Sequence, residues 1–149
     1  MKSVILKSFT MLMLTMALAA VTAQAQSANQ MKASIPFRFI IGNQTLPAGE
    51  YTVRYVNQDS GKNALLFKST DGRTSRIVRM NTTQSGEARM KASLVFNQYG
   101  DSYFLSEVWT GTDQYGLSLP KSRTERQLKD GDLSNVEAKR VTVALNAGR

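Results

Sequence analysis

The sequence of 149 residues contains neither cysteine nor histidine. The chain therefore cannot form a disulfide, a cysteine–histidine zinc site or an iron–sulfur cluster. The same absence excludes Ser-His-Asp and Cys-His catalytic groups. Apolar residues make up 42% and charged residues 20% of the chain, as in a folded globular domain, and the length suits one domain. We expect no cofactor and no metal.

Long apolar runs are scarce as well. Residues 11–21 form an uncharged run of 11 residues, whereas a membrane-spanning helix needs about 20. Lys2 and Lys7 precede this run, and the small-x-small sequence Ala23-Gln24-Ala25 follows it. This order predicts that residues 1–25 are a secretory signal peptide, removed on export, and not an anchor. We expect the mature protein in the periplasm or the extracellular space, without a transmembrane segment.

The mature chain would be basic. After residue 25 it keeps 17 basic and all 11 acidic residues, a net charge of +6. Exported small domains often carry disulfides, but this chain has no cysteine. Its stability must therefore come from an apolar core, which 124 residues can supply. Positive charge favours anionic envelope components or another envelope protein as partner. No helix or aromatic motif typical of specific nucleic-acid binding is present.

The rest of the chain has the pattern of strands joined by short turns. Apolar and polar residues alternate, and turn sequences such as Asp71-Gly72 separate the alternating segments. This spacing indicates an antiparallel, meander-like sandwich or a small, partly open barrel of six to seven strands. After a loose lead-in at 26–33, residues 34–149 form one β-rich domain. Strands are predicted at 34–41, 51–56, 64–69, 75–83, 89–97, 102–110 and 140–145.

One short helix is predicted near the C-terminus, after a polar loop at 111–119. Ser122-Arg123-Thr124-Glu125 matches a capping box, in which the hydroxyl accepts from the Glu125 amide and the carboxylate returns to the cap. The predicted helix covers about 121–129. Its cations, which we consider as an anion-binding set, are Lys121, Arg123, Arg126 and Lys129; a solvated helix face is the more ordinary interpretation.

Glu107 is the carboxylate that would matter most for catalysis. Strict alternation puts it on one face of its strand with Leu105 and Trp109. If that face were the core, burial would raise the pKa of Glu107, as in a general acid.

A structural role for Glu107 is the more ordinary alternative. Its carboxylate would then face solvent or pair across the sheet with Arg76 or Arg79. Glycoside hydrolysis needs a second carboxylate, and Asp101 lies where a turn favours aspartate in any case.

Aromatic residues offer a second kind of site. Tyr99, Trp109 and Tyr115 are candidates for a binding surface, with the loop residues Tyr99 and Tyr115 expected to be the most exposed. The alternative is that they fill the core and rim of a small β domain.

The assembled motifs resemble a group of uncharacterised small exported proteins of acidobacteria and similar soil bacteria. The resemblance lies in residues 35–42 (IPFRFIIG), 46–53 (LPAGEYTV), 94–109 (LVFNQYGDSYFLSEVW) and 119–126 (LPKSRTER). It implies an exported all-β domain, and it brings no activity and no site residues with it.

These observations predict an exported, non-enzymatic envelope or secreted protein that acts by binding or structural interaction. One alternative is a β-barrel carrier of a small hydrophobic ligand, its cavity lined by Phe37, Phe39, Tyr51 and Tyr55. The other is a metal-free hydrolase that uses Glu107.

Overall fold

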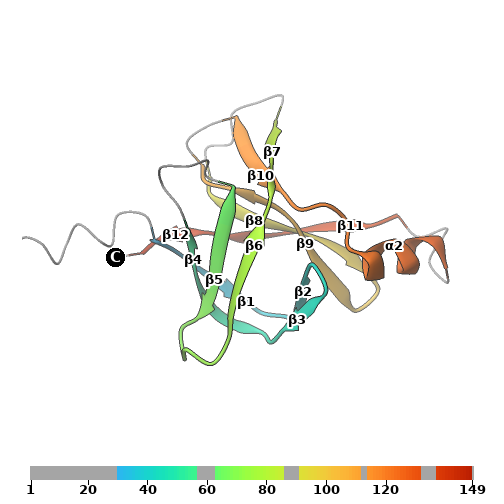
Figure 1. The fold of residues 1–149 in the computed structure, drawn as a ribbon, viewed down its shortest axis with the longest axis horizontal. Coiled ribbons are helices and arrows are strands. Elements are labelled where there is room, and N and C mark those ends of the chain that lie inside the picture. The colour runs from blue at the N-terminus through green and yellow to red at the C-terminus, as the bar shows by residue number, and fades with distance from the viewer. Residues whose placement is uncertain (1–29, 57–62, 86–90, 112–113, 132–136, 149) are drawn as a thin grey trace, which may run out of the picture.

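The computed structural model describes residues 30–56, 63–85, 91–111, 114–131 and 137–148. In these ranges the chain is mainly β, with two antiparallel-rich sheets and one short helix, as the sequence predicts. The strands of one sheet run across those of the other (Figure 1). Over the described residues, the two sheets do not close into a barrel.

The first sheet is antiparallel throughout and has five strands. They are β1 (Gln30–Ile35), β4 (Gly49–Tyr55), β5 (Ala64–Ser69), β6 (Ser75–Arg79) and β12 (Asn146–Ala147). Their order across the sheet is β12–β1–β4–β5–β6. Alternation decides the two faces: Tyr51 and Val53 of β4 are buried in the interior, whereas Arg54 between Val53 and Tyr55 is exposed.

The second sheet has seven strands. They are β2 (Phe39–Ile41), β3 (Gln44–Leu46), β7 (Asn81–Gln84), β8 (Ser93–Tyr99), β9 (Ser102–Trp109), β10 (Tyr115–Ser118) and β11 (Lys139–Ala144). Five follow one another in the order β11–β8–β9–β10–β7. The strand β2 pairs antiparallel with β3 and, through Ile40 and Phe104, parallel with β9.

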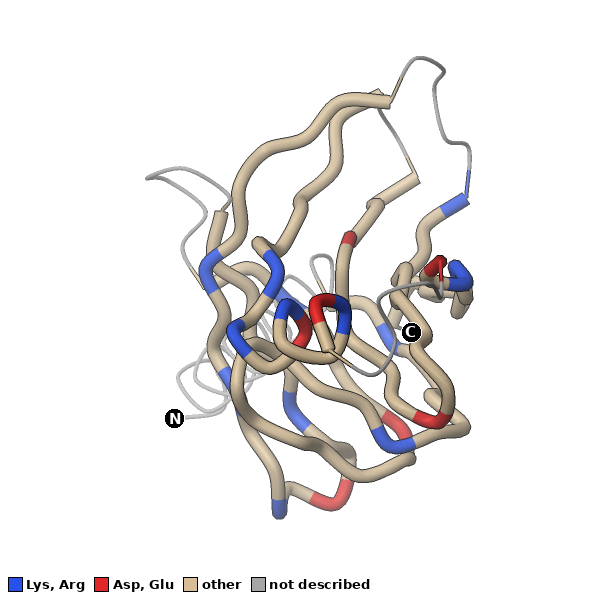
Figure 2. Tube along the Cα trace, turned by 90° about the vertical axis from the view of Figure 1, so that its right-hand side faces the viewer, with Lys and Arg blue, Asp and Glu red and all other residues tan. Residues whose placement is uncertain are grey.

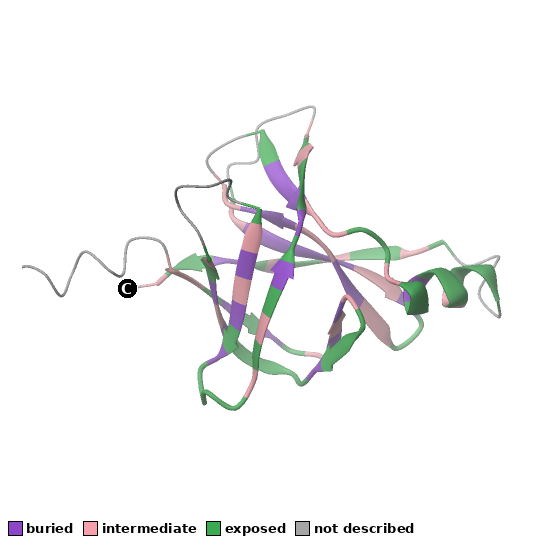
Figure 3. Cartoon of the chain, viewed as in Figure 1, coloured by how far each residue is buried: buried purple, intermediate pink, exposed green. Residues whose placement is uncertain are grey.

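The helix α2 (Arg123–Asp130) confirms the predicted helix to within two residues. The Ser122 hydroxyl accepts a hydrogen bond from the Glu125 amide at 3.1 Å, which is half of the expected capping box. The Glu125 carboxylate does not return to the cap but turns toward β8. Most of α2 is exposed, as Figure 3 shows.

One apolar core fills the space between the sheets. Aromatic rings lie at its centre: the centroid of Phe39 is 5.2 Å from that of Tyr51 and 5.6 Å from that of Phe96. Figure 3 shows buried residues of β5 alternating with less buried ones, and on β6 more buried residues alternating with exposed ones. The second predicted strand, 51–56, corresponds to β4, where Tyr51 and Val53 are buried and Arg54 is exposed. The alternation predicted for it is confirmed.

At two places the chain passes directly from a strand of one sheet into a strand of the other, with a single buried residue between the two strands. Met80 separates β6 from β7, and Leu145 separates β11 from β12. Their amides donate to the carbonyl oxygens of Asn63 at 2.7 Å and Ala92 at 2.9 Å. The predicted strand 75–83 therefore belongs to both sheets, whereas the predicted strand 140–145 lies in β11 of the second sheet up to Ala144 and ends at Leu145, just before β12.

Other strand boundaries also differ from the prediction. The segment 34–41 is two strands because Pro36, which has no amide hydrogen, separates β1 from β2. Residues 30–33 of the expected lead-in already pair with β4, and its residues 26–29 lie outside the described ranges. The polar loop 111–119 contains β10, whose pairing with β7 and β9 compensates for weak local propensity.

A β-bulge changes the two faces of β9. Val95 pairs with Glu107 but Phe96 pairs with Leu105, so Ser106 is an extra residue. Beyond this bulge the alternation is inverted. Leu105 and Val108 both enter the core, and Glu107 and Trp109 lie on the opposite, outer face. Glu107 and Trp109 therefore share a face, as expected, but Leu105 does not share it with them.

Candidate functional site

The outer face of the first sheet is the candidate site. Here this face means the outward-pointing side chains of β1, β4, β5 and β6. Its cations come one from each strand: Lys32, Arg54, Lys68 and Arg79. All four are exposed, and among the described residues none forms an ion pair. Glu50 is the only acidic residue at these outward positions.

Strand register brings these cations together. Lys32 pairs with Thr52, which pairs with Lys68, so the two lysines lie in one row, two strands and about 10 Å apart. Arg54 pairs with Leu66 and is thus diagonal to Lys68 on the neighbouring strand. Figure 2 shows Lys and Arg along several strands of the molecule.

A shallow hollow lies between Arg54 and Lys68. Its volume is about 200 Å³, and its lining includes the hydroxyl residues Thr52 and Thr70 and the amide of Gln30. No carboxylate lines it. The hollow therefore presents two positive charges and several neutral hydrogen-bonding groups.

Aliphatic side chains lie among the cations. Ile77 pairs with Leu66 across β5 and β6 and is 57% exposed. Val56, just beyond β4, is also exposed. Cations and exposed aliphatic groups on one face are typical of surfaces that bind at an anionic interface.

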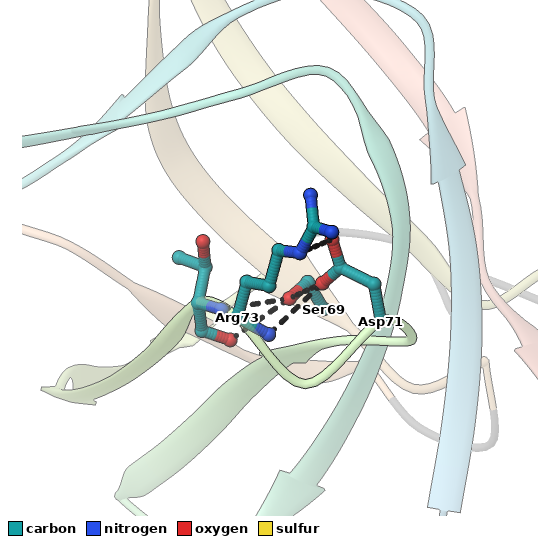
Figure 4. A network of polar contacts seen from close by, with 4 residues as sticks. Ser69, Asp71 and Arg73 are labelled. Carbon is teal, nitrogen blue, oxygen red and sulfur yellow. Dashed lines mark hydrogen bonds and ion pairs between the residues drawn. The ribbon is translucent and has the colours of Figure 1, made fainter.

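A second hollow, of about 460 Å³, lies beside the β5–β6 turn. There Asp71 accepts hydrogen bonds from the Ser69 hydroxyl at 2.5 Å and from the Arg73 amide at 3.0 Å, and Figure 4 shows this network. These bonds hold the pKa of Asp71 below its ordinary value, the Ser69 bond having the largest effect.

The same hollow contains Tyr51, whose hydroxyl donates to the Pro47 carbonyl oxygen at 2.8 Å. Burial, followed by the charge of Asp71, raises the pKa of Tyr51. The polar groups here bond to one another, and we therefore interpret them as turn-stabilising.

Glu107 points to the outer face of its sheet, as in the structural alternative, and not into the core. Its carboxylate pairs with Arg140 at 2.6 Å and accepts a hydrogen bond from the Trp109 indole at 2.8 Å. The expected pairing with Arg76 or Arg79 is wrong, because those residues belong to the other sheet.

The three aromatic candidates do not share a surface. Tyr99 is 2% exposed, so its expected exposure is wrong, and Trp109, the strand residue of the set, is also buried at 3%. Tyr99 is buried because its hydroxyl donates to Glu125 at 3.3 Å beneath α2, and its ring contacts Phe104. Tyr115 is 51% exposed, as predicted for a residue after a loop.

The basic set around α2 is divided by its contacts. Lys121 donates to the Tyr99 hydroxyl at 3.4 Å, whereas Arg123, Arg126 and Lys129 are exposed. Glu125, on the same helix, is 3% exposed and accepts a hydrogen bond from the side-chain amide of Asn97 at 2.8 Å. The Glu125 carboxylate thus anchors the helix to β8. Anion binding by Lys121, Arg123, Arg126 and Lys129 stays a prediction.

The second basic group in the sequence is also dispersed. Arg73 pairs with Asp71 in the turn at 3.8 Å, Arg76 points inward, and only Arg79 joins the outer face. These three arginines, although close in sequence, therefore lie in three different environments.

Three of the four aromatic side chains proposed to line a carrier's cavity, Phe37, Phe39 and Tyr51, pack against other rings. Phe37 stacks on Tyr103 with centroids 3.9 Å apart and meets Phe96 edge-on at 5.2 Å. Phe39 and Tyr51 meet edge-on in the core. These ring contacts belong to the packed core between the sheets.

Two wider searches of the described ranges complete this description. No group of three or more acidic side chains is placed to hold a metal ion there. In those ranges no helix combines the length and the hydrophobicity needed to span a bilayer. Comparisons with protein-family models, curated proteins and solved structures found no match for this chain.

Sequence reasoning missed the candidate face because its cations are far apart in the chain. In the sequence, Lys32, Arg54 and Lys68 each have an uncharged residue on both sides, so they form no basic cluster. Alternation does indicate that they point outward. Their adjacency depends on the register between strands, which the sequence pattern does not supply.

Proposed function

We propose that this chain is an exported, non-enzymatic protein that binds an anionic component of the cell envelope or its surroundings. The observation that carries the proposal is the outer face of the first sheet. It has four exposed cations from four strands and one acid, without ion pairs among the described residues. Charge of this kind attracts an anionic partner and speeds its association.

Two further features support binding over the alternatives. Glu107, on which a hydrolase would depend, is engaged by Arg140 and Trp109. The rings on which a carrier would depend, Phe39 among them, pack against each other in the core. The signal-like residues 1–25 and the net charge of +6 after them agree with a role outside the cytoplasm.

The test uses protein recovered after export in a bacterial host, with its mass measured to see whether it begins at Gln26. Binding is measured to immobilised heparin and to phosphatidylglycerol vesicles, with dextran and phosphatidylcholine vesicles as uncharged or zwitterionic references. Binding to at least one anionic probe, weakened by salt, is expected.

A charge-matched pair of variants locates the surface. Arg54→Glu/Lys68→Glu should weaken binding by about 30-fold or more, at roughly 1 kcal/mol for each cation lost. Arg123→Glu/Arg126→Glu changes the net charge equally on α2 and should weaken it by less than about threefold. Binding to neither anionic probe, or a loss confined to the α2 variant, would overturn the proposal.

A further inference from the structure

The hollow between Arg54 and Lys68 has the chemistry of a phosphate site. A guanidinium and an ammonium group flank it, and Thr52, Thr70 and Gln30 add neutral hydrogen-bonding groups. No carboxylate lines it to repel an anion. Arginine can bind two phosphate oxygens at once, and lysine adds a mobile charge.

The register allows both cations to reach one phosphate. Arg54 and Lys68 occupy diagonal positions on β4 and β5, where backbones are close enough for long side chains to converge. Both are exposed, and the structure shows no ion pair for either among the described residues.

Ile77 indicates what surrounds the phosphate. It follows Arg54 and Leu66 in one row across three strands, and more than half of its side chain is exposed. An aliphatic side chain at this place can enter the boundary between headgroups and acyl chains.

A polysaccharide fits this face less well. Sugar-binding surfaces commonly use aromatic rings, which combine apolar area with a polar tip. The outward positions of β1, β4, β5 and β6 carry no aromatic residue, because Tyr51 and Tyr55 point inward. Aliphatic groups among cations suit a lipid surface instead.

We propose that the outer face of the first sheet docks on an anionic phospholipid surface, with one lipid phosphate in the hollow between Arg54 and Lys68 and with Ile77 inserted beside it. This inference rests on the proposed function and names its partner. Arg79 and Lys32 flank the contact and add attraction for neighbouring headgroups.

The test measures binding of the exported protein to vesicles of phosphatidylglycerol and phosphatidylcholine, to vesicles of phosphatidylcholine alone, and to heparin. The protein should bind the phosphatidylglycerol vesicles and not those of phosphatidylcholine alone. Arg54→Gln/Lys68→Gln should weaken vesicle binding roughly 30-fold, whereas Arg123→Gln/Arg126→Gln, with the same net charge, should weaken it less than about threefold.

Two further variants separate phosphate recognition and insertion from simple charge. Arg54→Lys keeps the charge but loses the two-pronged contact, and should weaken vesicle binding about fivefold. Ile77→Ser should weaken vesicle binding about fivefold and leave heparin binding unchanged. Circular dichroism of each variant confirms that it is folded.

The outcomes distinguish this inference from the proposed function. Binding to heparin without binding to the vesicles would overturn the lipid proposal and leave the anionic partner standing. Equal vesicle binding by wild type, Arg54→Lys and Ile77→Ser would also overturn it. Binding to neither probe would overturn both.

Discussion

Trp109, the only tryptophan of the chain, packs directly against Gly116 on the neighbouring strand. A Cβ atom at Gly116 would lie 2.6 Å from the indole Cε3 atom, inside van der Waals contact. Glycine is therefore needed here for space, and its neighbour Trp109 reports any change through fluorescence.

We expect Gly116→Ala to lower the free energy of unfolding by about 1–3 kcal/mol, because the ring must move from a tightly packed place. Denaturant unfolding gives the stability, and a shift of the Trp109 emission to longer wavelength shows the displaced ring. The control is Gly100→Ala, which has positive φ but nothing within 4 Å of the added Cβ. It should cost about 1–2 kcal/mol through the backbone alone and leave the emission unchanged. Wild-type emission in Gly116→Ala would contradict the prediction.

Asp71 provides a prediction for pH. Hydrogen bonds from Ser69 and the Arg73 amide lower its folded-state pKa, so its contribution to stability is present above the unfolded pKa of about 3.9. That contribution is lost as the pH falls toward the folded-state pKa. Asp71→Asn should therefore be less stable than wild type at neutral pH, and the two should converge in acid.

Urea unfolding at several pH values checks this expectation. Ser69→Ala removes the hydrogen bond that lowers the pKa of Asp71 most. In the Ser69→Ala background, the loss of stability that Asp71→Asn causes at neutral pH should therefore be smaller. A gap between wild type and Asp71→Asn that stays constant from neutral pH to about pH 2 would contradict the prediction.

At the scale of elements, β6 is an edge strand of the first sheet with an inward-pointing charge. Arg76 lies between Ser75 and Ile77, pairs with Phe67 across β5, and its Nε is buried without a hydrogen-bond partner among the described residues. An inward charge on an edge strand discourages pairing with another molecule.

Arg76→Leu should raise the free energy of unfolding by about 1 kcal/mol, because it removes a buried, unpaired donor. It should also increase self-association, since the edge strand loses its inward-pointing charge. Denaturant unfolding and sedimentation velocity measure the two effects. The control Arg79→Leu, on the outer face, should change stability by less than about 0.5 kcal/mol. A destabilised, monomeric Arg76→Leu would show that the arginine has another role.

Local pattern predicted most strands, and it failed where one strand serves two sheets. The segment 64–69 coincides with β5 because it stays in one sheet and ends at Asp71-Gly72. Around Met80 the sequence shows no break in its strand-like pattern, yet the chain bends there and passes from β6 of the first sheet into β7 of the second. Such a bend depends on what packs beneath it, and the periodicity of the sequence does not contain that information.

The bulge at Ser106 explains the failure at Glu107. An extra residue inverts the alternation, and nothing in the composition of 102–110 marks its place. Glu107 therefore meets Arg140, which follows it by more than thirty residues and arrives on β11. Long-range pairing, and not local propensity, determined the surroundings of both residues.

The whole molecule depends on strands that continue between sheets. The last residues of the chain illustrate this: β11 pairs with β8 in the second sheet, and β12 pairs with β1 in the first. The pairs Met31–Ala147 and Lys32–Asn146 join the start of the described fold to its end. Since β1 begins at Gln30, a chain beginning at Gln26 would keep all of these pairs.

Removal of residues 1–25 should therefore leave the fold intact. We expect the chain from Gln26 to unfold in one cooperative transition, within about 0.5 kcal/mol of the full-length chain, as measured by urea denaturation and Trp109 emission. A chain from Ala33 is the matched comparison, because it loses β1 residues that pair with both β4 and β12. It should be less stable by about 2–4 kcal/mol through lost hydrogen bonds and lost burial of Met31. If the chain from Gln26 were destabilised as much as the chain from Ala33, the first 25 residues would have to be part of the folded structure, and the interpretation as a removable leader would fail.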